Sequence, residues 1–146
     1  MKIEGKHFRS IWLDPNLPLV HAIDQRKLPF DFEIRELSSS ADVAWAISHM
    51  VVRGAPLIGA AAAYGLFLAA SENPSDDYLE TASNMLLDAR PTAVNLRWAI
   101  EKLLPLMIRA KPSDRSKIAR IAAEELCDDD ILANNNIGDH GVTLLT

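Results

Sequence analysis

Two arginines that stand close to prolines are the residues of this sequence best suited to chemistry. Arg53 lies three residues before Pro56, and Arg90 immediately precedes Pro91. Proline favours the first turn of a helix, where free backbone N–H groups and the positive end of the helix dipole attract anions. We therefore expect each arginine at a helix N-terminus. Because guanidinium binds phosphate through two parallel hydrogen bonds, the pair predicts a site for a small phosphorylated molecule.

The residues that follow Arg53 are small. Gly54 and Ala55 would let a ligand approach the backbone closely. In an alternative interpretation, Arg53 and Arg90 pair with some of the 20 acidic residues, and Gly54 only turns the chain. The residues by themselves leave both interpretations open.

The other reactive side chains do not form a recognisable catalytic set. The four histidines are scattered without the spacing of a metal site, so we expect no metal. Cys127 precedes three aspartates, whose charge disfavours the thiolate, so we expect a packed residue rather than a nucleophile. Asp24 follows a predicted strand and is interpreted as a turn former, while Trp45 and Trp98 are assigned to the core. The chain therefore offers binding groups without an acid–base pair or an activated nucleophile.

Composition excludes several classes of protein. The chain has 146 residues, 49% of them hydrophobic, which suits one domain with a real core. A net charge of -5 without a basic block argues against nucleic acid or anionic membrane as partners. A single cysteine allows no internal disulfide, and the N-terminus does not resemble a signal peptide, so a cytoplasmic location is expected.

The segment VVRGAPLIGAAAAYGLFLAAS, residues 51–71, has no charge after Arg53 and approaches the length of a membrane span. It consists mostly of alanine and glycine, which contribute little transfer free energy. We therefore predict a helix buried in the protein rather than in a membrane.

The period of the hydrophobic residues changes near residue 38. Residues 1–37 contain three short apolar segments, in HFRSIWL, PLVHAID and DFEIREL, which predict an antiparallel β layer. Residues 38–146 predict a second, helical subdomain of about five helices, so the fold class is α+β. The expected helix boundaries are a cap among the serines at 38–40, starts at Pro56 and Pro91, N-caps at Ser75 and Ser113, a kink or end at Pro105, and a break at 134–138.

Three motifs resemble a known family. VVRGAPLIGAAAAYG, RPTAVNLRWA and AIDQRKLPF resemble hallmark segments of the methylthioribose-1-phosphate isomerases, in the same order, and NNNIGDHGVTLL looks like the end of that family's N-terminal domain. The resemblance implies an aldose–ketose isomerase that converts 5-methylthioribose 1-phosphate to 5-methylthioribulose 1-phosphate in methionine salvage. It also implies that Arg53, Gly54, Ala55 and Arg90 bind the substrate, without metal or organic cofactor, and that the complete enzyme is a homodimer.

The resemblance also implies what this chain lacks. The catalytic cysteine and aspartate of the family belong to a C-terminal Rossmann-like domain, which the 146 residues do not include, and Cys127 does not match that cysteine. No catalytic residue is therefore expected in the chain, and the chain alone is expected to be inactive.

Other functions remain open. The chain also resembles ribose-1,5-bisphosphate isomerases and the regulatory subunits of translation initiation factor 2B, which implies a non-catalytic domain that senses sugar phosphates. A helical interaction domain whose arginines pair internally is the third possibility.

Overall fold

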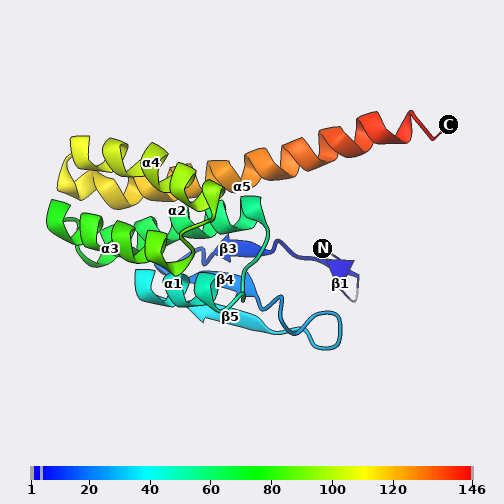
Figure 1. The fold of residues 1–146 in the computed structure, drawn as a ribbon, viewed down its shortest axis with the longest axis horizontal. Helices are drawn as coiled ribbons and strands as arrows, with labels where there is room; N and C mark the ends of the chain where they lie inside the picture. Colours follow the sequence, from blue (N-terminus) through cyan, green and yellow to red (C-terminus); the bar gives the residue numbers. More distant parts are fainter. Residues whose placement is uncertain (1, 4, 146) are drawn as a thin grey trace.

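A small β layer precedes five helices in the computed structural model, which describes residues 2–3 and 5–145 (Figure 1). The strands are β1 (Lys2–Ile3), β2 (Lys6–His7), β3 (Ile11–Leu13), β4 (Val20–Ile23) and β5 (Ile34–Leu37). The helices are α1 (Ser40–Ser48), α2 (Ala55–Glu72), α3 (Asp76–Ala89), α4 (Val94–Arg109) and α5 (Pro112–Val142). The predicted α+β class, with an antiparallel β layer followed by five helices, is confirmed.

Strands β3, β4 and β5 form one antiparallel sheet, with β4 in the centre. Ile11 pairs with Ala22, and Val20 pairs with Leu37. These four side chains are buried and belong to the same hydrophobic core as the helices. The three strands match the three predicted segments, and the short β1–β2 pair lies before them.

Helix α2 is the centre of the helical layer, in contact with each of the other four helices. Its small residues make this possible, because a Cβ on Gly65 would lie 2.9 Å from Leu86 Cδ2 and one on Gly59 would lie 3.1 Å from the Asn95 carbonyl oxygen. By length and composition α2 could cross a membrane, but 72% of it is buried inside the structure. Its apolar composition is therefore that of a core helix, as predicted.

The predicted helix start at Pro91 is wrong. Helix α3 ends at Ala89 with Arg90 as its C-cap, residues 91–92 form a turn, and α4 begins at Val94. The Ala93 N–H donates to the Arg90 carbonyl oxygen at 3.0 Å, so Pro91 occupies the second position of a turn, another place where its fixed φ is favoured. Arg90 thus lies at the negative end of the α3 dipole, where a cation is favourable.

Neither α4 nor α5 ends at the positions where an end or a break was predicted. Pro105 lies inside α4 without ending it, and its side chain is exposed, so the carbonyl that loses its partner can meet water. Helix α5 has Lys111 rather than Ser113 as its N-cap, begins at Pro112 and runs through the asparagines at 134–136 and Gly138 to Val142. Asparagine and glycine are weak helix formers rather than absolute breakers, and the first half of α5 is held by packing on α2 and α4.

The buried faces of the helices agree with the prediction for α4 and differ for α3 and α5. All five predicted residues of α4 are buried: Leu96, Ala99, Ile100, Leu103 and Met107. Helix α3 buries Leu79, Ala82, Ser83 and Leu86 instead of Tyr78, Met85 and Ala89, and α5 buries Arg115, Ala119, Ala123 and Cys127 instead of Ile118, Ile121 and Ala122. Small residues of α5 face α2 because the two helices approach closely.

The prediction that Trp45 and Trp98 belong to the core is wrong. Their exposed fractions are 43% and 49%. Each lies beneath a cation, with the Arg26 guanidinium 5.4 Å from the Trp45 ring and Lys102 Nζ 5.0 Å from the Trp98 ring. Both rings therefore contribute to the surface rather than to the interior.

Candidate functional site

Arg53 is positioned by a sharp connection between α1 and α2. Val51 and Val52 are fully buried and anchor this segment, whereas Arg53 is exposed. Gly54 follows with a φ of 97°, a conformation that favours glycine, and serves as the N-cap of α2. Arg53 therefore stands at the N-terminus of α2, as predicted.

The start of α2 has no negative charge of its own. Gly54 supplies no side-chain cap, and the first turn contains no acidic residue. The N–H groups at the start of a helix have no partner within the helix, so an anion at this position would be favourable. The Arg53 guanidinium makes one hydrogen bond among the described residues, from Nη2 to the Gln25 carbonyl oxygen at 2.8 Å. Its other N–H donors can bind a ligand.

Arg90 reaches the same connection from the end of α3. Its Nη1 lies 3.4 Å from the sulfur of Met50, three residues before Arg53. In residues 2–3 and 5–145, neither arginine is ion-paired with a carboxylate. The alternative of internal pairing therefore finds no support, although Arg90 approaches from a helix C-terminus and not from an N-terminus.

Asp24 lies beside this site and is more than a turn former. As predicted for a turn, the Arg26 N–H donates to Asp24 Oδ1 and the Lys27 N–H donates to the Asp24 carbonyl oxygen. The carboxylate is also completely buried and ion-paired with Arg26 at 2.6 Å and Arg35 at 3.1 Å. The hydrogen bonds from Arg26, and then those from Arg35, hold the pKa of Asp24 well below its usual range despite its burial.

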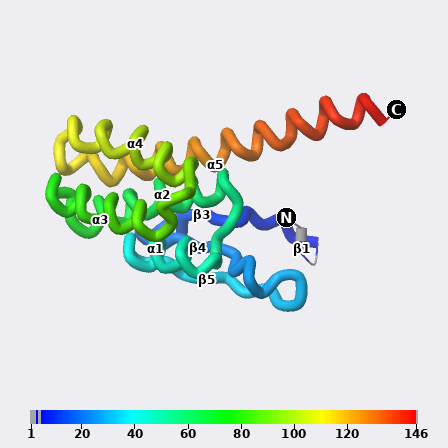
Figure 2. The backbone as a smooth tube through the Cα atoms, in the orientation of Figure 1, coloured from blue at the N-terminus to red at the C-terminus, as the bar shows by residue number. Residues whose placement is uncertain are grey.

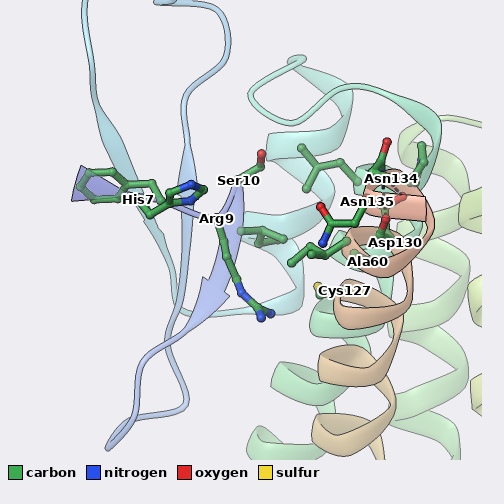
Figure 3. Close-up of a pocket in the computed structure, with 13 residues that line it drawn as sticks. His7, Arg9, Ser10, Ala60, Cys127, Asp130, Asn134 and Asn135 are labelled. Atoms are coloured by element: carbon green, nitrogen blue, oxygen red, sulfur yellow. Dashed lines mark hydrogen bonds between the residues drawn. The ribbon is translucent and has the colours of Figure 1, made fainter. Parts of the chain in front are cut away.

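A cavity of about 400 Å³ opens beside the start of α2 (Figure 3). Its base includes Pro56, Leu57 and Ala60 of α2. In Figure 3, His7 at the end of β2 and Arg9 and Ser10 of the β2–β3 connection line it, opposite Asp130, Asn134 and Asn135 of α5. Arg53, Gly54, Ala55 and Arg90 do not line this cavity.

Sequence reasoning missed this cavity because its two walls lie more than a hundred residues apart in the chain. The Arg9–Asp128 ion pair, at 2.7 Å, joins them. The only local signal is the asparagine run at 134–136, which by itself predicts a helix break. On a continuous α5, Asn134 and Asn135 instead present amide groups to the cavity.

Cys127 is not an activated nucleophile. Cys127 is buried, and its Sγ lies 3.9 Å from the Tyr64 hydroxyl. Burial raises the pKa of the Cys127 thiol, and Tyr64 and Arg9 only partly oppose this effect. Residues 2–3 and 5–145 contain no group of three or more potential metal ligands arranged around one point.

We expect Cys127 to react slowly with thiol reagents. Both the raised pKa and the burial of the sulfur reduce the concentration of accessible thiolate. At pH 7.5 the folded protein should react at least ~10-fold more slowly with Ellman's reagent than the unfolded chain, measured by absorbance. Equal rates for the folded and unfolded forms would contradict the inert role given to Cys127.

The chain is similar in sequence and in structure to known isomerases. The chain is 47% identical to the methylthioribose-1-phosphate isomerase of Acidiphilium cryptum, over 99% of this chain and 40% of that protein. The crystal structure of 5-methylthioribose 1-phosphate isomerase from Pyrococcus horikoshii superposes with a TM-score of 0.85 and 34% identity, covering 93% of this chain and 40% of that one.

A second solved structure is also similar. Translation initiation factor eIF-2B subunit delta from A. fulgidus has a TM-score of 0.78 and 36% identity, covering 86% of this chain and 38% of that one. The chain spans about 40% of the length of the curated isomerases it matches. The sequence profile of the Initiation factor 2 subunit family matches residues 51–146, and the chain belongs to that family.

Proposed function

We propose that this chain is the N-terminal, substrate-binding portion of an isomerase that converts 5-methylthioribose 1-phosphate to 5-methylthioribulose 1-phosphate. The observation that carries this proposal is the Arg53 site. An exposed guanidinium without a carboxylate partner in residues 2–3 and 5–145 stands at a helix N-terminus that has no acid in its first turn. Such a site suits a phosphate, and the Acidiphilium and Pyrococcus isomerases are similar to the chain over more than nine-tenths of its length.

The chemistry requires groups that the described residues do not supply. A phosphate ester at C1 masks the aldehyde of the sugar, so spontaneous ring opening is blocked and an enzyme must move protons between positioned acid and base groups. Among the described residues, the buried Cys127 has a raised pKa and Asp24 is neutralised by two arginines. In this proposal the acid and base come from the part of the relatives' length that these 146 residues do not span.

Within this proposal the chain binds and orients the substrate. Arg53, Gly54 and Ala55, at the start of α2, contact one part of the sugar phosphate. Arg90 contributes a second cation. Residues 1–37 and 38–146 act as two subdomains of one N-terminal domain, since sheet and helices share a core. The complete enzyme is a cytoplasmic homodimer that needs no metal or organic cofactor.

The test is turnover by the protein expressed from its complete reading frame. We expect it to convert 5-methylthioribose 1-phosphate to the ketose, followed by loss of the anomeric proton signal in NMR. Residues 1–146 alone should give no turnover with the same substrate. An inactive complete protein would contradict the proposal, and activity of the 146-residue chain would contradict the assignment of catalysis to other residues.

A second candidate is a regulatory domain that binds a sugar phosphate without converting it. The similarity to an initiation-factor subunit, at a TM-score of 0.78, favours it. A complete protein that binds the sugar phosphate in an equilibrium titration but leaves it unchanged would support this function over the isomerase.

A further inference from the structure

The main chain of Gln25 holds the segment that carries Arg53. The Gln25 N–H donates to the Val51 carbonyl oxygen at 3.0 Å, and the Gln25 carbonyl oxygen accepts from Arg53 Nη2 at 2.8 Å. The backbone of Gln25 thus bonds both to the backbone before Arg53 and to the Arg53 guanidinium. Because Arg53 makes no other hydrogen bond among the described residues, the direction of its free donors depends on where the Gln25 carbonyl lies.

The position of Gln25 is in turn set by Asp24. The Asp24 N–H donates to the Glu33 carbonyl oxygen at 2.9 Å, which ties the turn to the segment before β5. The Asp24 carboxylate accepts from Arg26 Nε at 2.8 Å and Nη2 at 2.6 Å, and from Arg35 Nε at 3.1 Å. These bonds hold the residues before and after Gln25 in place, at the start of the loop that joins β4 to β5. This loop projects from the sheet in Figure 2.

We propose that Asp24 is a positioning residue for the anion site: through the 24–27 turn it holds the Gln25 carbonyl that orients the Arg53 guanidinium toward a phosphate. This inference rests on the proposed function in so far as Arg53 binds the phosphate of a sugar. It adds a residue that does not touch the ligand and lies far from Arg53 in the sequence.

Electrostatics and positioning predict opposite signs for the same substitution. In Asp24→Asn a negative charge near Arg53 disappears, so the site becomes more positive, and a purely electrostatic effect would strengthen phosphate binding. If Asp24 instead positions Gln25, the released Arg26 and Arg35 let the turn shift and binding weakens. In metal sites, loss of the outer groups that orient a ligand residue typically costs about 10- to 100-fold in affinity or activity, and we expect the lower end of that range here.

Asp14 offers a matched control. It is another aspartate whose side chain anchors a turn, accepting from the Asn16 N–H at 2.8 Å and the Leu17 N–H at 3.0 Å. It lies in the β3–β4 hairpin and pairs with His21 rather than with the segment around Arg53. Asp14→Asn therefore removes the charge of another turn-anchoring aspartate without reaching the anion site.

The experiment is a double-mutant cycle on the protein expressed from its complete reading frame. Wild type, Asp24→Asn, Arg53→Ala, the double variant and Asp14→Asn are titrated with inorganic phosphate, and binding is followed by the arginine Nε–Hε NMR signals and tryptophan indole signals. Turnover of 5-methylthioribose 1-phosphate is measured in parallel, and thermal unfolding verifies that each variant is folded. Arg35→Gln, which removes one of the two partners of Asp24 at a half-exposed position, replaces Asp24→Asn if that variant does not fold.

We expect Asp24→Asn to weaken phosphate binding about 10-fold, to raise KM more than it lowers kcat, and to have less than about 2-fold effect once Arg53 is alanine. Asp14→Asn should bind phosphate like wild type. An equal loss in both Arg53 backgrounds, or tighter binding by Asp24→Asn, would overturn the positioning role.

The two proposals fail in distinguishable ways. An active wild type without coupling between Asp24 and Arg53 overturns only the positioning role. A wild type that is inactive but shows the coupling on phosphate overturns only the isomerase. A wild type that neither binds phosphate nor turns over the sugar overturns both.

Discussion

Replacement of Arg115 by methionine is expected to lower the free energy of unfolding by about 3 kcal/mol, the largest effect on stability that we predict. The Arg115 side chain is 5% exposed and connects three helices. Its guanidinium donates to the carbonyl oxygens of Ile108 and Ala110 at the end of α4, to the Pro74 carbonyl oxygen before α3, and to Asp76. Methionine fills the space but leaves these acceptors without a donor.

The measurement is urea unfolding followed by circular dichroism. Arg120→Met is the matched control, because Arg120 lies on the same helix but is half exposed, and among the described residues its ion pair is with Glu124, one turn later. Such an exposed pair contributes about 0.3–0.5 kcal/mol. If both substitutions changed the stability equally, Arg115 would not connect the helices as its contacts indicate.

Arg115 also shows why the buried face of α5 differs from the predicted one. Sequence periodicity assigns apolar residues to the core and charged residues to solvent, so it predicts that Ile118 and Ile121 are buried. The structure instead buries Arg115 and the small residues at every fourth position after it, on a helix that packs closely on α2. On α4, where the apolar residues are large and regularly spaced, the same reasoning identifies every buried position.

The error at Pro91 has a different cause. Proline has the same fixed φ at the first position of a helix and at the second position of a turn, so the local signal cannot separate the two. The Ala93–Arg90 hydrogen bond and the packing of α4, which begins three residues after Pro91, select the turn over the helix start. At Pro56 a glycine stands two residues before the proline, and the predicted start of α2 is correct within one residue. In the structure this glycine is the N-cap and has a positive φ.

Of the candidate site, the sequence indicated the cations but not what surrounds them. Arg53 at the start of α2 followed from Gly54 and Pro56. The contact with Gln25 depends on how the β4–β5 loop docks on the α1–α2 connection, which no local pattern encodes. The same holds for Arg90, whose contact with Met50 brings the end of α3 to the same connection.

We expect Arg53→Ala and Arg90→Ala each to reduce kcat/KM for 5-methylthioribose 1-phosphate by about 10²-fold in the complete protein. A hydrogen bond from a charged group to a ligand contributes about 1.5–3 kcal/mol, which corresponds to roughly 10- to 150-fold. For Arg90→Ala the loss should lie mainly in KM, because a phosphate that does not react is bound equally in the ground and transition states. Steady-state kinetics separates the two parameters.

Arg97→Ala is the control for these variants. Arg97 lies on α4, is about half exposed and has a loose pair with Glu101 at 4.0 Å, so its removal should leave both parameters unchanged. Neither Arg53 nor Arg90 is paired with a described carboxylate, so their removal should change the free energy of unfolding by less than about 0.5 kcal/mol. Loss of activity without loss of stability would then report ligand binding, whereas wild-type affinity of Arg90→Ala for the sugar phosphate would refute its phosphate role.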